Sequence, residues 1–163
     1  MSMTLNPVNE AAFQKAVQSL ETLNRAAVFH PTGTGKSCIA WKVVEAHPQT
    51  TFFWLVAGAQ RLALRQAELT RYNGGTLPGN VRFCDCEKLA AATPEQWVRL
   101  GEQKPGCIVL DCYHELSAVC WAQSVQKLLR MCPQAKVLGL GVPNGAPVCA
   151  AAQELFADCI VSH

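Results

Sequence analysis

The sequence lacks an excess of charge of either sign and lacks long hydrophobic runs. Its 163 residues include fourteen Lys and Arg against twelve Asp and Glu, a formal net charge of +2. A nucleic-acid footprint readable from composition needs a strong basic excess, so the charge balance alone identifies no partner. No apolar run reaches the ~18 residues of a membrane span, and no basic N-terminal stretch leads into an apolar core. We therefore expect no membrane partner and no signal peptide.

The cysteines lack the spacing of a zinc site or of a disulfide framework. The chain has nine of them, an odd number, and no two are spaced as CxxC. Structural zinc sites usually have paired ligands, and disulfide frameworks usually belong to shorter secreted chains. We expect reduced, mostly buried thiols in a cytoplasmic protein. The positions are 38, 84, 86, 107, 112, 120, 132, 149 and 159.

Short apolar runs alternate with helical patterns along the whole chain, with no internal repeat or low-complexity linker. Asn6 and Pro7 are typical of a helix start, and Phe13, Ala16, Val17, Leu20 and Leu23 fall on one face of the helix that follows. Further helices are expected near residues 35–46, 60–71, 95–100, 117–130 and 147–156, with a loop over 72–80. The expected strands are residues 26–29, 51–56, 81–84, 107–110, 136–140 and 159–161.

This alternation predicts an α/β fold of three layers, a mostly parallel sheet with helices on both faces. Half the residues are apolar and 16% are charged, as in a globular domain with a large interior. At this length we expect one domain that covers residues 1–163. Ligands on such sheets bind beyond the carboxyl ends of the strands.

Residues 31–37 read Pro-Thr-Gly-Thr-Gly-Lys-Ser and match the second half of the phosphate-loop motif G-x-x-x-x-G-K-[ST]. Gly33 and Gly35 would let the backbone curl so that the N–H groups of Thr32 to Ser37 point at phosphate oxygens. The side chain of Lys36 would reach the outer phosphates, and the hydroxyl of Ser37 would ligate Mg²⁺. The loop therefore predicts a site for a nucleoside triphosphate, ATP with Mg²⁺. His30 stands where the motif begins with a small residue.

Asp111 follows the apolar strand at 107–110, as residues 31–37 follow the strand at 26–29. The carboxyl ends of parallel strands meet at one edge of a sheet, so both segments should open onto the same site. The carboxylate of Asp111 is then expected to be a second ligand of Mg²⁺.

Six segments together resemble the first motor domain of superfamily-two helicases, the DEAD/DEAH group that includes type III restriction translocases. They are Phe13-Gln14, residues 31–37, residues 55–58 with Arg61, residues 81–89, residues 111–114 and residues 138–144. The resemblance implies a RecA-like ATP-binding fold with catalytic roles for Lys36, Asp111 and His114. It also implies that the Gln14 amide reads adenine, that His114 links the nucleotide to the coupling segment at 138–144, and that residues 55–61 and 81–89 face nucleic acid.

Two departures from that family bear on hydrolysis. Cys112 stands where the family has the Glu that positions the attacking water, and Gly141-Val142-Pro143 replaces the hydroxyls of the coupling motif. A thiol does not replace that carboxylate, and losing such a group costs ~10²–10⁴ in rate. The resemblance also implies a nucleic-acid partner, with DNA favoured over RNA, and a second RecA-like domain beyond this chain. We expect the chain to be the first motor domain of a longer helicase or translocase.

Two alternatives remain open. A small P-loop kinase shares the phosphate loop and the length but usually has an arginine-bearing lid, and Arg130 is the only arginine after Asp111. A nucleotide-gated binding module without catalysis is favoured by Cys112 and the altered coupling segment. Four arginines are expected to be either solvated surface residues or contacts to nucleic-acid phosphates: Arg61, Arg65, Arg71 and Arg82.

Overall fold

Six short strands form one sheet in the order β3-β2-β4-β5-β1-β6, and every pairing in it is parallel. The structure is a computed structural model that describes residues 2–111, 113–143 and 150–162. The strands are β1 (Arg25–Phe29), β2 (Phe52–Val56), β3 (Val81–Asp85), β4 (Cys107–Asp111), β5 (Lys136–Gly141) and β6 (Ile160–Ser162). All six lie where the apolar runs predicted them.

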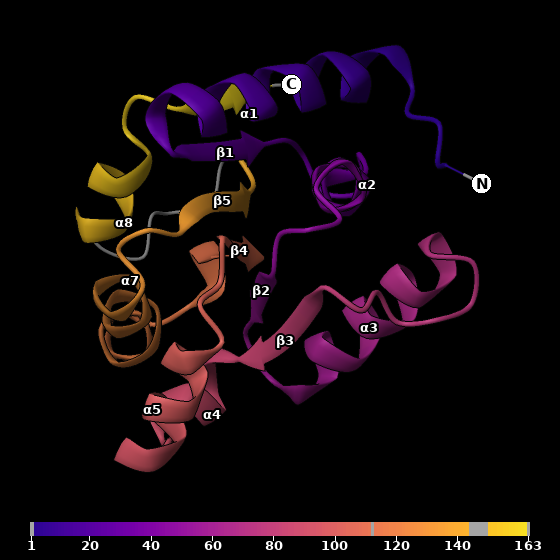
Figure 1. The fold of residues 1–163 in the computed structure, drawn as a ribbon. Coiled ribbons are helices and arrows are strands. Elements are labelled where there is room, and N and C mark those ends of the chain that lie inside the picture. Colours follow the sequence, from indigo (N-terminus) through magenta and orange to yellow (C-terminus); the bar gives the residue numbers. More distant parts are fainter. Residues whose placement is uncertain (1, 112, 144–149, 163) are drawn as a thin grey trace.

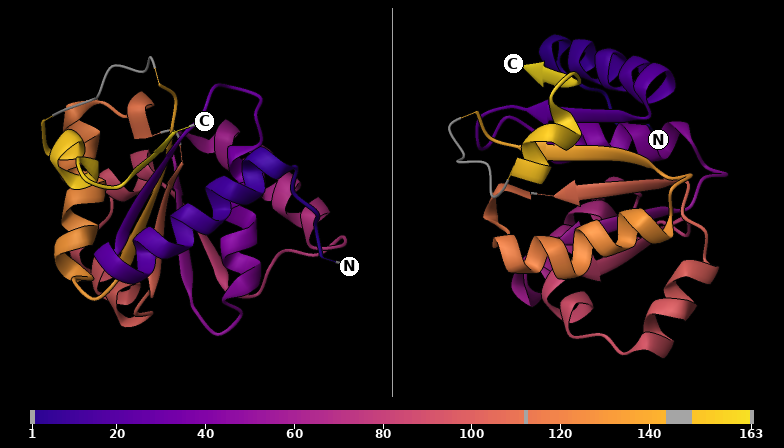
Figure 2. Two further views of the ribbon diagram at one scale, coloured as in Figure 1. Left: turned by 90° about the horizontal axis from the view of Figure 1, so that it is seen from above. Right: turned by 90° about the vertical axis from the view of Figure 1, so that its left-hand side faces the viewer.

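Helices cover both faces of the sheet and complete three layers, so the predicted α/β fold is confirmed (Figures 1 and 2). One face carries α1 (Pro7–Leu23), α2 (Lys36–Ala46) and α3 (Ala59–Tyr72). The other carries α4 (Cys86–Ala90), α5 (Pro94–Glu102), a 3₁₀ turn η1 (Tyr113–Glu115), α6 (Ala118–Cys120), η2 (Trp121–Gln126), α7 (Lys127–Met131) and α8 (Ala150–Phe156).

Strand β2 is apolar throughout and β4 is apolar up to Asp111, because both of their faces are buried. In β2 and β4 all five residues are buried. Successive residues point to opposite faces. Trp54 and Val109 therefore join the core beneath α1, α2 and α3, while Phe53 and Ile108 join the core on the other side. Continuous apolar runs are the pattern of a parallel sheet covered on both sides.

The first helix begins as its sequence predicts. The Asn6 side chain accepts a hydrogen bond of 2.8 Å from the N–H of Asn9, and Pro7 occupies the first turn. Ala16 and Leu20 are buried against the sheet, but Leu23 is 42% exposed. Leu23 is the last helical residue and lies past the edge of the buried stripe, so the prediction that it shares that stripe was wrong at this position.

Three details of the helices differ from the predictions. The short helix α4 was not expected; Asp85 caps it by accepting from the N–H of Glu87 at 3.0 Å. The helix expected over 117–130 contains a π-helical stretch, η2, where the Ser124 hydroxyl donates to the Cys120 carbonyl at 2.5 Å. Tyr72 ends α3 instead of opening the loop. The first part of the helix expected at 147–156 lies outside the described residues.

The polar and sulfur-containing side chains of the interior follow the sequence-based expectations. Of the seven cysteines that the structure describes, four are buried and three are partly exposed, and all are free thiols. The four tryptophans are each at most 4% exposed and pack in the interior: Trp41, Trp54, Trp97 and Trp121. Within the described ranges no helix has the length and apolar character needed to cross a bilayer.

Candidate functional site

The two segments singled out in the sequence lie at the same edge of the sheet. Strand β5 pairs with β1 on one side and with β4 on the other, so the loop after β1 and the end of β4 flank it. Residues of that loop, Asp111 and Val142 line one cavity of about 470 Å³. The predicted shared edge is confirmed, and the cavity has the size of a small-molecule site.

The loop after β1 leaves a row of backbone donors open. Gly33 and Gly35 have φ values of +81° and +90°, and α2 begins at Lys36. Within the described chain the N–H groups of Gly33, Thr34, Gly35 and Ser37 donate to no acceptor. Open donors at a helix start, together with the helix dipole, form a binding site for an anion. The hydroxyl of Thr34 donates to the Pro31 carbonyl at 2.7 Å and holds the curl.

Lys36 folds back over its own loop. Its Nζ donates to the carbonyls of His30 at 2.9 Å and Pro31 at 3.0 Å, and its side chain lines the cavity. His30 itself is fully buried, so the bulky residue at the first motif position packs into the interior and leaves the loop its curl. Thr32 is exposed at the rim of the same cavity.

Asn9 ties α1 to the loop and was missed by sequence reasoning. Its Nδ2 donates to the Thr34 carbonyl at 2.9 Å, and the residue is 5% exposed. Gln14, the residue expected to read adenine, is exposed on the same helix and donates to Glu10 Oε1 at 2.9 Å. The structure thus assigns the direct contact with the loop to Asn9, while Gln14 projects into solvent.

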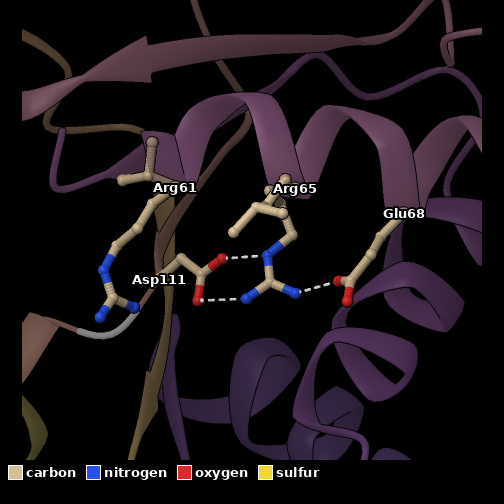
Figure 3. Close-up of a pocket in the computed structure, with 6 residues that line it drawn as sticks. Arg61, Arg65, Glu68 and Asp111 are labelled. Carbon is tan, nitrogen blue, oxygen red and sulfur yellow. Dashed lines mark hydrogen bonds and ion pairs between the residues drawn. The ribbon is translucent and has the colours of Figure 1, made fainter. Parts of the chain in front are cut away.

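Asp111 is buried at the end of β4 and is held by three donors. Its Oδ2 accepts from Arg65 Nε at 2.5 Å and from Trp54 Nε1 at 2.9 Å, and its Oδ1 accepts from Arg65 Nη2 at 3.2 Å. Figure 3 shows the Arg65 guanidinium between the carboxylates of Asp111 and Glu68, to which it is also ion-paired. Asp111 lies two residues beyond Val109, so it points to the face that carries Trp54 and α3.

A polar stripe on α3 forms one wall of the cavity. Four polar residues at spacings of four, three and four lie on one face of the helix and line the cavity: Arg61, Arg65, Glu68 and Tyr72. Arg61 forms an ion pair with Glu115 of η1. Arg65 is 20% exposed at its side chain and belongs to the cavity. Reading Arg65 as a solvated residue was wrong, because it pairs with the buried Asp111, whereas the side chain of Arg61 is 46% exposed.

Tyr72 approaches the start of α2. Its hydroxyl accepts from the Cys38 thiol at 3.3 Å and lies 3.4 Å from the Ser37 hydroxyl. Burial, followed by the Cys38 contact, raises the pKa of the Tyr72 phenol, so it remains protonated at neutral pH. In the contact between Tyr72 and Ser37 either hydroxyl can be the donor. The Ser37 hydroxyl is therefore within reach of an internal partner.

The structure describes only part of the segments at 111–114 and 138–144. The backbone of His114 lies in η1, directly after the strand that carries Asp111. Cys112 lies outside the described residues, as does Asn144 at the end of the expected coupling segment. Residues 138–141 of that segment form most of β5, and Val142 reaches the cavity.

The two loops expected to face nucleic acid are joined to each other. The N–H of Gly58, after β2, donates to Asp85 Oδ1 at 3.1 Å, at the end of β3. The same oxygen caps α4. These loops lie at the carboxyl ends of neighbouring strands, on the edge of the sheet that also carries the cavity.

Comparison with known proteins supports the fold. No protein-family model and no curated protein matches the sequence. Among solved structures, the chain is similar to the crystal structure of a hypothetical ATP-dependent RNA helicase from Sulfolobus tokodaii, with a TM-score of 0.67 and 9% identity. The match covers 98% of this chain and 57% of that one. At this identity the likeness concerns the fold alone, a RecA-like parallel sheet with helices on both faces.

Proposed function

We propose that this chain is the ATP-binding domain of a helicase-like protein. The observation that supports it best is the row of open N–H donors at the start of α2, beside Lys36 and across a cavity from Asp111. Backbone donors, a helix dipole and a mobile ammonium together suit the phosphates of a nucleoside triphosphate. In this proposal Thr32 to Ser37 hold the phosphates, and Lys36 moves from its loop carbonyls to the outer ones.

The base would lie beside α1. Gln14 is the residue proposed to read adenine, which requires its amide to leave Glu10. Asn9 would act indirectly, since its hydrogen bond to the Thr34 carbonyl fixes the loop. His114 would link the nucleotide to the segment around Val142, as the family resemblance implies.

The residues present do not fit the predicted magnesium site in its usual form. The predicted ligands are Ser37 and Asp111. Three donors already occupy the Asp111 carboxylate, and Mg²⁺ demands short bonds in near-ideal octahedral geometry.

Hydrolysis should be slow. Cys112 replaces the carboxylate that would position water, and Arg65 neutralises the neighbouring Asp111. The ion pair favours the alternative of a nucleotide-gated binding module over a fast motor. The kinase alternative gains no support, because Arg130 is exposed on α7 and is not part of the cavity wall.

The partners in this proposal are a nucleic acid and a second RecA-like domain. The loops joined by Gly58 and Asp85 are the proposed nucleic-acid contacts. The preference for DNA came from the sequence resemblance, whereas the structural neighbour carries the name of an RNA helicase. Binding assays with single strands of both kinds, with and without ATP, would decide between them.

Titration of a fluorescent ATP analogue tests the nucleotide site. Lys36→Ala should weaken binding roughly 10- to 100-fold, since it removes a charge-assisted contact to phosphate. Lys42→Ala is the matched control: it removes the same charge from the same helix, where Lys42 pairs with Glu45 away from the cavity. Equal affinity of the Lys36→Ala protein and the parent would reject the proposal.

A further inference from the structure

The carboxylates of the phosphate cavity are already paired with arginines. Three acidic residues line it, and each is ion-paired: Asp111 and Glu68 with Arg65, and Glu115 with Arg61. In a site built for a divalent cation, acidic side chains supply negative charge to the metal. Here two guanidinium groups of α3 already meet the three carboxylates, and Lys36 adds a third positive charge to the same cavity lining.

The Asp111 pair is also hard to open. Its carboxylate has about four acceptor positions, and Arg65 and Trp54 fill three of them. The side chains are 3% and 20% exposed, so separating the pair would leave two charges in a poorly solvated place. A divalent cation arriving at Asp111 would also be repelled by the adjacent guanidinium. The second expected ligand, Ser37, has the Tyr72 hydroxyl 3.4 Å away.

Arg65 is placed to contact phosphate oxygens directly, beside Lys36. It lines the same cavity as Lys36 and Ser37, and Figure 3 shows its guanidinium held in place by two carboxylates. A guanidinium matches phosphate oxygens as well as it matches carboxylates, and it stays charged at every physiological pH. Fixed between Asp111 and Glu68, it requires little further ordering when an anion arrives.

We infer that Arg65 takes the place of the divalent cation, so that this chain binds a nucleoside triphosphate free of magnesium. The inference rests on the proposed function and sharpens it: the ligand is the metal-free triphosphate. Asp111 becomes a positioning residue for Arg65 instead of a metal ligand. Lys36, Arg65 and the open N–H groups of the loop then carry the phosphates together.

The test compares ATP binding in EDTA with binding in excess Mg²⁺, using the full chain and a fluorescent ATP analogue. The parent should bind in EDTA at least as tightly as in Mg²⁺. Arg65→Gln should lose 10-fold or more of its affinity in EDTA. Arg99→Gln is the control, because Arg99 is exposed on α5 and does not line the cavity, and it should behave as the parent does.

The possible outcomes distinguish a failure of metal-free binding from a failure of the proposed ATP binding itself. A parent that binds only with Mg²⁺ would overturn the inference and leave ATP binding intact, whereas a parent that binds in neither buffer would overturn both. Unchanged affinity of Arg65→Gln in EDTA would exclude the role of Arg65. Since that variant leaves Asp111 unpaired and could unfold, Arg65→Gln/Asp111→Asn provides a second test: it should fold and show the same loss in EDTA. Asp111→Asn alone should lose affinity equally in EDTA and in Mg²⁺, because it disturbs only the placement of Arg65, whereas a loss confined to Mg²⁺ would point to a metal ligand.

Discussion

Gly35 satisfies two separate constraints at the start of α2. Its φ of +90° lies in the left-handed region that other residues rarely adopt, and a Cβ there would lie 2.9 Å from Asn9 Nδ2. The first constraint belongs to the curl of the phosphate loop. The second belongs to the contact between α1 and that loop, because Asn9 needs this approach to reach the Thr34 carbonyl. One residue therefore couples the loop's shape to its anchoring.

Gly35→Ala should both destabilise the chain and weaken ATP binding. The left-handed backbone costs roughly 1–2 kcal/mol for alanine, and displacement of Asn9 adds about 1–2 kcal/mol from its lost hydrogen bond. Gly74→Ala separates the two effects, since Gly74 has a φ of +73° but open space around it. Urea unfolding and nucleotide titration measure both. Equal losses of stability in the two variants, with ATP affinity retained in Gly35→Ala, would contradict this account.

At the scale of elements, β5 acts as the spacer between the strands that carry the loop and Asp111. Its fit against α8 depends on Gly139, where a Cβ would lie 2.6 Å from Phe156 Cζ. Phe156 is 1% exposed, and its ring lies 5.0 Å from that of Tyr113. The close approach of α8 to β5 thus positions the residues that follow β4.

Gly139→Ala should destabilise the chain by roughly 1–3 kcal/mol, because an added methyl overpacks the contact with Phe156. Phe156→Ala should cost about 3–5 kcal/mol through the cavity that it opens. In the double variant the methyl enters vacated space, so the losses should fall short of additive by about 1 kcal/mol or more. Urea unfolding of the four proteins measures this coupling, and strict additivity would show that Gly139 is not the contact point.

The polar stripe of α3 also marks where sequence reasoning reached its limit. Strands such as β2 and β4 were predictable because runs of four or five consecutive apolar residues have few other uses in a chain of this kind. The phosphate loop was predictable from a motif whose parts each serve the same chemistry. A clear helical period relates Arg61, Arg65, Glu68 and Tyr72. Polar residues at helical spacing, however, do not reveal whether that side of the helix faces solvent or a cavity.

What decides between those two readings is the partner across the gap. Asp111 and Trp54 share a face of the sheet by strand parity and register, and α3 follows β2 directly. A carboxylate on the face that receives a helix needs a cation from that helix, and Arg65 is within reach. That combination was present in the sequence as a signal. The contact of Asn9 with Thr34 was not, because it depends on the distance between α1 and the loop.

At the scale of the whole molecule, the interior contains buried cysteine thiols whose pKa is raised. Burial raises the pKa of Cys86 and of Cys107 to about 12, from an ordinary value of 9.0. They belong to the cores on opposite faces of the sheet. Both thiols are neutral in the folded chain at pH 10, whereas in the unfolded chain they are mostly ionised. Unfolding therefore releases protons in this range, and stability must fall as pH rises.

The contribution of these two thiols to the free energy of unfolding should accordingly stay nearly constant as pH rises to about 9, and decline above it. At pH 10 each should contribute a loss of about 1 kcal/mol relative to pH 8, since one pKa unit corresponds to about 1.4 kcal/mol. Urea unfolding at pH 8, 9 and 10 under reducing conditions measures the decline. Cys86→Ala/Cys107→Ala is less stable at every pH because it loses packing, but its decline between pH 8 and 10 should be smaller by about 2 kcal/mol. An identical decline in parent and variant would mean that these thiols are accessible to water in the folded chain, and the two cores would then be less tightly closed over the sheet than their burial indicates.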